Sequence, residues 1–397
     1  MNALDITPQK YGLYYPYFHV RDERWLKLSA LYWPRIVRIV PEDYPTRDSE
    51  TVRVLQSEAD FIRNRPPGRS VDVASAVFLE AVHDNVAGLH ARYGIDAEAA
   101  RTLESPRRRP DISAVHTSQI RPDLAQALVE AGLAVNERID LSDEVDRSWL
   151  VMHEALVAVY TSVLAEDFAE ANKLIPTTDQ PAAYAVANDW APGRIASVLL
   201  DDGTGPANSA HESSAVHEAL AFLALDLVVP ADLDMVPAGR IVAVRRDFGA
   251  EFLAFRTLVD QTAVELSNLH GVRDSGVLRG YLQDVVVERF EAPLAELRHA
   301  LASSRLGVAT MAINVKTQLP ASMMVAGGAW LAGHPAVAGS AVASIGLLAV
   351  GHDARRQRKS IQATNPAVSY LMHTQETMRN QTLLRRTMRR VQRIGGV

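Results

Sequence analysis

The apolar positions in the first part of the chain alternate between strand-like and helix-like spacing. The segment from Tyr11 to Val20 is rich in aromatic and β-branched residues, which predicts a strand. Asp22 is a good helix N-cap residue, and apolar residues follow it at helical spacing, so a helix is expected to begin there. A second short strand is expected from Ile36 to Val40, before the chain breaks at Pro41.

The same alternation continues to about residue 145. A helix is expected over residues 71–93, closed by Gly94, and a strand over residues 111–116. Apolar residues then recur at helical spacing from Leu124 to Leu133, so that a strand–helix unit repeats. Residues 1–145 are therefore predicted to form an α/β domain with short strands.

Helical spacing dominates residues 146–310, which we predict to be a mainly helical domain. One helix is expected over residues 149–174, where large apolar side chains trace a single face. Residues 240–245 (RIVAVR) predict a short strand, and helix dominates again over residues 251–306.

The C-terminal part has a different pattern. The 36 residues between Lys316 and Asp353 contain no Asp, Glu, Lys or Arg, and the tripeptide Gly333-His334-Pro335 divides them into two apolar halves. Each half as a helix is shorter than the ~30 Å hydrocarbon layer of a bilayer. We predict an apolar Gly/Ala-rich helical hairpin over residues 311–353 and a basic amphipathic tail over residues 354–397. The whole chain is predicted to be α+β and predominantly helical.

Charge is distributed unevenly along the 397 residues. Up to Asp353 there are 31 basic and 46 acidic residues, a balance of −15, and the rest has ten basic and one acidic, a balance of +9, which together give the net charge of −6. Cysteine is absent, which excludes disulfides, thiolate zinc sites and a catalytic thiol. The N-terminus has an early Asp5 and no secretory signal pattern, so a cytoplasmic location is expected.

An uncharged stretch followed by a basic tail is typical of a segment that contacts a membrane. One interpretation is a shallow hairpin at the inner membrane face, with both ends in the cytoplasm. The other is a helical hairpin packed inside the soluble fold or within a homo-oligomer. In the first, lipid contacts would come from the large apolar residues Met323, Met324, Trp330, Leu331, Ile345, Leu347 and Leu348.

The tail predicts a helix with one basic face. An anionic lipid surface, a nucleic acid or the acidic body of the same chain could each bind this face. Nucleic acid is the least favoured partner, because the stretch lacks interleaved aromatic residues. The basic residues concerned are Arg355, Arg356, Arg358, Lys359, Arg385, Arg386, Arg389, Arg390 and Arg393.

The N-terminal residues resemble those of a known family. The pattern Tyr14-Tyr15-Pro16-Tyr17-x-His19-x-Arg21-Asp22-x-x-Trp25-Leu26-Lys27 is similar to the opening of a family of bacterial, largely actinobacterial, proteins known only as a domain of unknown function. Blocks within residues 160–179 and 236–256 fit the same family, so the resemblance spans roughly residues 11–270. It implies membership of the family and no particular activity.

The same N-terminal stretch is the densest group of side chains able to stack, donate hydrogen bonds and titrate. A strand that leads into a helix is where α/β proteins tend to place ligands, so a pocket is one interpretation. The other is that the aromatic residues form core and that Asp22 caps a helix. The candidate pocket comprises Tyr15, Tyr17, His19, Arg21, Asp22 and Trp25.

No motif predicts a metal site, a cofactor or an activated nucleophile. The pattern most similar to a zinc-binding helix is His211-Glu212 with His217-Glu218. Its histidines are six residues apart instead of four, so they fall on nearly opposite faces of a helix. We expect no cofactor and a solvated helix start at this position. His153 is expected to be structural, and Thr178-Asp179 to form a turn or a helix cap.

Three hypotheses about function follow. The first is a non-enzymatic cytoplasmic sensor or effector that engages a protein partner and the inner membrane surface through the hairpin and tail. The alternative is a soluble enzyme or a nucleic-acid-acting protein with its pocket near the N-terminal cluster. A structural homo-oligomer is the third. The sequence does not decide whether the chain is an enzyme, and it favours a non-enzymatic role.

Overall fold

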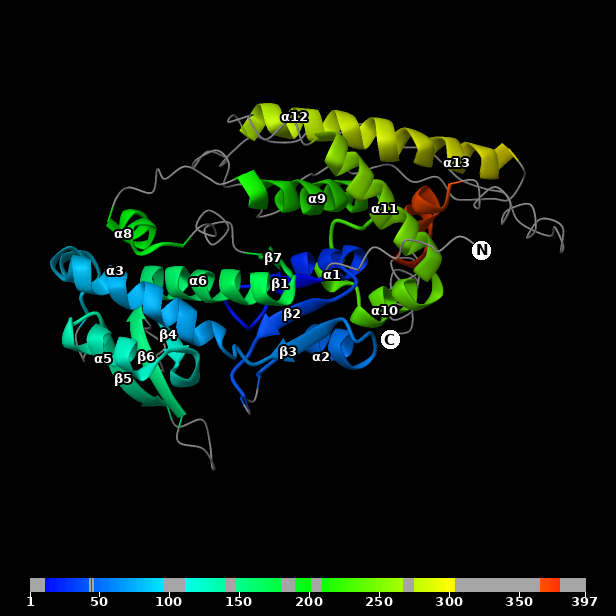
Figure 1. The fold of residues 1–397 in the computed structure, drawn as a ribbon. Coiled ribbons are helices and arrows are strands. Elements are labelled where there is room, and N and C mark those ends of the chain that lie inside the picture. Colours follow the sequence, from blue (N-terminus) through cyan, green and yellow to red (C-terminus); the bar gives the residue numbers. More distant parts are fainter. Residues whose placement is uncertain are drawn as a thin grey trace, which may run out of the picture. The chain divides into compact units, whose positions relative to one another are not determined.

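A computed structural model shows that the chain divides into two compact units (Figure 1). Unit 1 comprises residues 1–20, 34–47 and 62–211, and unit 2 comprises residues 21–33, 48–61 and 212–397. Helices occur in both units, and the described strands lie in unit 1, so the predicted class, α+β and predominantly helical, is confirmed. The structure describes residues 11–42, 44, 46–95, 111–139, 147–179, 190–200, 209–266, 275–303 and 365–378.

A four-stranded parallel sheet forms the first part of unit 1. Its strands are β1 (Gly12–Tyr14), β2 (Ile36–Ile39), β3 (Ile62–Arg65) and β7 (Ile175–Thr177), in the order β3-β2-β1-β7. The chain therefore runs from β1 through β2 to β3 on one side and adds β7 on the other side of β1. This reversal makes the junction of β1 and β7 a topological switch point.

A three-stranded antiparallel sheet forms the second part of unit 1. It contains β4 (Ile112–His116), β5 (Ala134–Ile139) and β6 (Arg147–His153) in the order β4-β6-β5. The short helix α5 (Pro122–Glu130) leads into β5 through Gly132, whose φ of 67° is a backbone conformation that favours glycine.

The predicted helix over residues 149–174 is wrong in its first turn. Residues up to His153 belong to β6, and α6 (Glu154–Asn172) begins only after it. His153 ends the strand and caps the helix, because its Nδ1 accepts a hydrogen bond from the amide of Ala155 at 3.1 Å. The structural role expected for His153 is confirmed.

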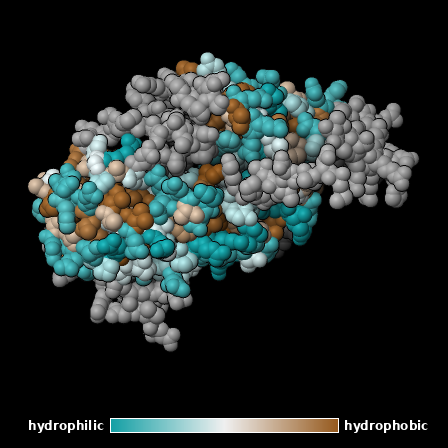
Figure 2. All heavy atoms as spheres, viewed as in Figure 1, coloured by the Kyte–Doolittle hydropathy of each residue, from teal (hydrophilic) through white to brown (hydrophobic). Residues whose placement is uncertain are grey.

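Besides α5, the described part of unit 1 contains the helices α3 (Ser70–Tyr93), α6 and α8 (Pro192–Leu200). Figure 1 shows α3 and α6 side by side, and both contribute to one apolar core. Gly88 permits the close approach of α3 and α8, since a Cβ there would meet Leu200 Cδ2 at 3.3 Å. On the face drawn in Figure 2, apolar residues gather over the region of α3 and α6.

The described elements of unit 2 are helices. The predicted strand over residues 240–245 is wrong, because this segment lies in α10, where Ala238, Ile241 and Val242 form one buried face at helical spacing. Val287–Glu291 form a π-helical turn that joins α12 to α13. The α-helices among its described residues are α1 (Glu23–Tyr32), α2 (Glu50–Ser57), α9 (Ser209–Asp226), α10 (Ala238–Asp247), α11 (Gly249–Glu265), α12 (Ser275–Val286), α13 (Ala292–Ser303) and a last one over residues 366–378.

The predicted hairpin and basic face lie outside the described residues. Residues 319–351, with the seven predicted lipid contacts, and the nine basic residues from Arg355 to Arg393 are among those not described. Within the described part, no helix has both the length and the apolar character needed to cross a bilayer. The boundary predicted near residue 145 falls inside unit 1, which continues to residue 211.

Candidate functional site

A row of polar side chains crosses the parallel sheet of unit 1 near its carboxyl edge. The register pairs Tyr14 of β1 with Thr177 of β7 on one side and with Arg38 of β2 on the other, and Arg38 in turn with Asn64 of β3. Residues paired in this way point to the same face of a sheet. Thr177, Tyr14, Arg38 and Asn64 are therefore neighbours in one layer, which we call the polar row.

Arg38 is the most unusual member of the polar row, since it is a charged residue with no exposed surface in an inner strand. Its Nε donates to Asn64 Oδ1 at 2.6 Å, and its Nη1 donates to the backbone oxygen of Phe18 at 2.9 Å. Burying a guanidinium is costly unless its donors are bound. These bonds therefore attach the loop that follows β1 to the sheet.

Tyr14 makes the second attachment, at the switch point between β1 and β7. Its hydroxyl lies 2.9 Å from Oδ1 of Asp179, just beyond β7, and 3.2 Å from the backbone oxygen of His19. Both the tyrosine and the aspartate are buried. The hydroxyl has one hydrogen to donate, so these two acceptors share it.

The loop fixed in this way, residues 15–20, presents two rings to a larger aromatic cluster. The ring of Phe18 lies 4.6 Å from that of His19 and 5.0 Å from that of Tyr44, measured between centroids. Tyr44 lies edge-on to Trp149 of β6, at 5.7 Å, and to His116 at the end of β4, at 6.1 Å. We call Phe18, His19, Tyr44, His116 and Trp149 the ring cluster.

The members of the ring cluster differ in exposure. Phe18, His19, Tyr44 and His116 are half-buried, whereas Trp149 is buried with 7% of its surface exposed. The two sheets of unit 1 thus meet in a partly accessible aromatic surface, and the polar row supports it from within the sheet.

Three of the six predicted pocket residues lie at the carboxyl edge of the parallel sheet in unit 1. Tyr15 is buried, and its amide donates to the backbone oxygen of Thr177, which extends the pairing of β1 with β7. Tyr17 and His19 are half-buried in the same loop. The peptide bond between Tyr15 and Pro16 is cis.

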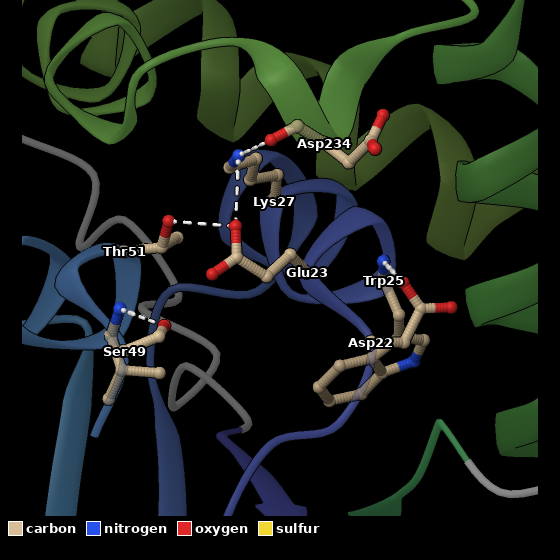
Figure 3. Close-up of polar contacts among 8 residues, drawn as sticks. Asp22, Glu23, Trp25, Lys27, Ser49, Thr51 and Asp234 are labelled. Atoms are coloured by element: carbon tan, nitrogen blue, oxygen red, sulfur yellow. Dashed lines mark hydrogen bonds and ion pairs between the residues drawn. The ribbon is translucent and has the colours of Figure 1, made fainter. Parts of the chain in front are cut away.

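The other half of the predicted pocket, Arg21, Asp22 and Trp25, belongs to unit 2 (Figure 3). Asp22 caps α1 by accepting a hydrogen bond from the amide of Trp25 at 3.0 Å, as the sequence predicts. The indole of Trp25 is buried in the core of unit 2. The structural interpretation therefore describes Asp22 and Trp25 better than a ligand site does.

Unit 2 contains its own buried polar contacts next to these residues (Figure 3). Lys27 of α1 is almost fully buried, and its Nζ donates to the backbone oxygen of Asp234 at 2.6 Å and lies 3.5 Å from Glu23 Oε2. The same carboxylate accepts from the hydroxyl of Thr51 on α2 at 3.0 Å. These contacts connect α1 to α2 and to the turn after α9.

The end of α1 is held in a similar way. Arg245 of α10 donates through Nη1 to the backbone oxygens of Ala30 and Trp33, the second at 2.9 Å. Tyr370 of the last helix donates to the backbone oxygen of Leu31 at 2.8 Å. Carbonyl groups at a helix end otherwise lack partners, so these side chains serve as C-terminal caps.

Of the His/Glu pairs considered for metal binding, the side chains of His217 and Glu218 are described. Glu218 is buried, and Trp33 Nε1 donates to it at 3.3 Å, so the expected solvated helix start is wrong at this residue. His217 lies 3.9 Å from Asp260. The described residues hold no group of three side chains able to bind a metal ion.

The pKa of Asp226, a carboxylate of unit 2, is raised. Burial raises the pKa of Asp226 to about 6, although Arg24 Nη2 lies 2.6 Å from its Oδ1 and lowers the pKa in part. The loss of solvation of the ionised form therefore outweighs the attraction of the guanidinium.

The fold and the polar row define an α+β protein with a small parallel sheet whose switch point carries buried charged groups. The chain belongs to DUF6236, a family of unknown function, which matches residues 111–379. The predicted membership of a family without assigned function is confirmed, while the N-terminal motif lies before the matched residues. Comparisons with curated proteins and with solved structures give no significant match.

Most of the polar row has no clear signal in the sequence. Arg38 interrupts the apolar run of β2, and a charged residue inside such a run is a signal that it meets a specific partner. The sequence predicts a turn or a helix cap at Asp179, which does follow β7, and its carboxylate accepts a hydrogen bond from Tyr14. That contact joins residues 165 positions apart, which no local pattern reports.

Proposed function

We propose that unit 1 binds a small molecule on the ring cluster at the carboxyl edge of its parallel sheet. The observation that carries the proposal is the pair of attachments made by Tyr14 and Arg38, which fix the backbone of the loop that bears Phe18 and His19. Ligands of open α/β sheets bind beyond the carboxyl ends of the strands, at the switch point. The ring cluster lies at this end of the sheet.

The energetics of the polar row support a binding role. Apolar residues of similar size stabilise a fold as well as buried charged residues do, and often better. Arg38 and Asp179 are buried at one sheet edge, and the bonds of Arg38 and Tyr14 hold a loop in place. A rigid loop binds a ligand with a smaller loss of conformational entropy.

A thermal-shift screen with the full-length protein tests this proposal. The compounds are nucleosides, nucleotides, sugars, amino acids and aromatic acids, each at millimolar concentration. A ligand of the ring cluster should raise the unfolding temperature of the wild type, and His19→Ala should reduce that shift. The matched control is His83→Ala, because His83 is exposed on α3 of the same unit and should leave the shift unchanged.

Two results would contradict the proposal. One is that no compound class shifts the unfolding temperature of the wild type. The other is a ligand whose shift is the same in the wild type and in His19→Ala, because such a ligand binds elsewhere.

The sensor hypothesis remains compatible with this binding role. Its membrane part depends on residues outside the described ranges. The neighbouring described segments lie together, since Arg298 Nη2 of α13 donates to Gln375 Oε1 of the last helix at 2.7 Å. The described segments on the two sides of the predicted hairpin therefore contact each other within unit 2.

A vesicle flotation assay tests the membrane part. The full-length protein should float with vesicles rich in phosphatidylglycerol and stay unbound with neutral phosphatidylcholine vesicles. Replacement of Arg385, Arg386, Arg389 and Arg390 by Gln should weaken binding to the anionic vesicles. Absence of the wild type from both floating fractions would count against the hypothesis.

A further inference from the structure

The outer face of α12 carries large apolar side chains. Val277 and Tyr281 of this helix, and Val287 in the π-helical turn that joins it to α13, each have 50% of their surface exposed. The opposite face of α12 belongs to the core, since Leu282 and Val286 are buried. A surface helix normally presents polar residues to water, so this exposed apolar face is unusual. The residues at helical spacing on it, which we call the outer stripe, are Val277, Gly280, Tyr281, Asp284 and Val287.

Gly280 lies in the middle of the outer stripe, where the packing of the chain does not require a glycine. A Cβ at this position would meet no described atom within 4 Å, apart from the backbone of its own helix. Glycine in a helix interior is less favourable than alanine. Within one chain Gly280 therefore weakens the helix without a gain in packing. The missing side chain does allow a second helix to approach the backbone closely.

The outer stripe is nearly symmetric about the level of Leu282. Val277 lies five residues before Leu282, and Val287 lies five residues after it. If two copies of α12 pack antiparallel about a two-fold axis at this level, Val277 of each copy meets Val287 of the other. In the same register Asp284 lies opposite Gly280 and not opposite another carboxylate. The stripe is therefore complementary to itself in both apolar character and charge.

We propose that the outer stripe binds a second copy of this chain through antiparallel packing of the two α12 helices. The symmetric placement of the valines and the glycine opposite the aspartate favour a second copy, because a different partner would need neither. A stable interface buries about 800 Å² on each partner, and one helix face with three half-exposed apolar side chains supplies less. The dimer is therefore expected to form reversibly, with a dissociation constant in the micromolar range. This association does not depend on ligand binding to unit 1.

Sedimentation velocity of the full-length protein, from about 1 to about 200 μM, tests the proposal. The wild type should change from monomer to dimer over this range. Tyr281→Glu places a carboxylate in the centre of the outer stripe, and it should raise the dissociation constant of the dimer at least about 10-fold. The matched control is Val73→Glu, because Val73 is 47% exposed on α3 of unit 1 and should leave the dissociation constant unchanged.

A second variant tests the role of Gly280. Gly280→Ala should raise the unfolding temperature by about 2 °C at a concentration where the protein is monomeric, because alanine favours the helix and has room there. The same change should weaken the dimer about 10-fold, since the methyl group keeps the second helix away. The control is Gly239→Ala in α10, where a Cβ likewise meets no described atom within 4 Å. It should leave the dissociation constant unchanged.

Two results would overturn the proposal. One is a wild type that stays monomeric over the whole concentration range. The other is a dimer whose dissociation constant is the same in the wild type, Tyr281→Glu and Gly280→Ala, because such a dimer forms through another surface. Circular dichroism of each variant as a monomer shows that a loss of dimer does not come from unfolding.

Discussion

The two units bury polar groups for different purposes. In unit 2, Lys27, Arg245 and Tyr370 donate to backbone oxygens of a turn or of a helix end, so that each bond fixes the position of one helical element against another. In unit 1, Arg38 and Tyr14 donate to the backbone of a loop that carries half-exposed rings.

This difference shows how to separate structural polar groups from candidates for function. A buried donor that caps a helix completes the hydrogen bonding of the helix itself. A buried donor that fixes an exposed loop at the carboxyl end of a parallel sheet stabilises a surface that can meet a ligand. Burial alone does not distinguish the two cases, whereas the segment that receives the bond does.

The largest effect is expected from Arg38→Met, which tests whether the polar row holds the loop. The substitution leaves Asn64 Oδ1 and the Phe18 oxygen without this donor, and it should lower the free energy of unfolding by about 4 kcal/mol. Urea denaturation measures this change. Arg65→Met is the control, because Arg65 is exposed at the end of β3, and a change below about 0.5 kcal/mol is expected.

A pH-dependent effect of about 3 kcal/mol is expected from Asp226 in unit 2. Burial raises its pKa from the ordinary value of 3.8 to about 6, so the folded state binds the proton more tightly than the unfolded state. Stability from this group is therefore gained as the pH falls from about 6 to about 4, and lost as it rises. Asp226→Asn should remove this pH dependence.

Denaturation at several pH values, with the wild type and Asp226→Asn side by side, measures the difference. A difference that grows in favour of the wild type as the pH rises would show that the bond with Arg24 dominates and that the folded-state pKa is lowered instead.

A smaller loss, about 2 kcal/mol, is expected from Arg245→Met, which removes the cap of α1. Ligand binding to unit 1 should be unaffected, in contrast to Arg38→Met. The neighbouring Arg246 is mostly exposed and pairs with Asp247, so Arg246→Met is a matched control with little effect. Equal destabilisation by the two variants would argue against the cap.

The smallest loss of stability is expected from removing one buried hydroxyl group in each unit, and this pair of variants compares the two units most directly. Tyr14→Phe and Tyr370→Phe each remove one buried hydroxyl and should each lower stability by about 1 kcal/mol. Only Tyr14→Phe should also weaken ligand binding, because it frees the loop at His19. Calorimetry with the ligand found in the screen measures this, and equal affinity of both variants would contradict the comparison.

Local patterns predicted many elements correctly. The cap at Asp22, the strands β2 and β4 and the helix α3 agree with the sequence predictions, because each depends on residues close together in the chain. The strand predicted over residues 240–245 is wrong, since a short apolar run fits a strand and a buried helix face equally well.

The candidate site could be predicted only in part. The N-terminal stretch rich in aromatic and titratable side chains predicts a pocket that includes Tyr17 and His19, and both residues lie at the sheet edge. Arg21, Asp22 and Trp25 were grouped with them because they are adjacent in sequence, but they belong to unit 2. Trp149 and His116 could not be predicted as neighbours of this loop, since they come from strands more than seventy residues after Tyr44.

The sequence by itself determined the fold class, the lack of cysteine chemistry and the positions of caps and strand cores, because these depend on composition and on short-range spacing. Only the tertiary structure decided which polar groups meet. The order β3-β2-β1-β7 places Thr177 and Asn64 in one row with Tyr14 and Arg38. Strand order and register arise from the packing of the whole unit, so the site they create has no local signature.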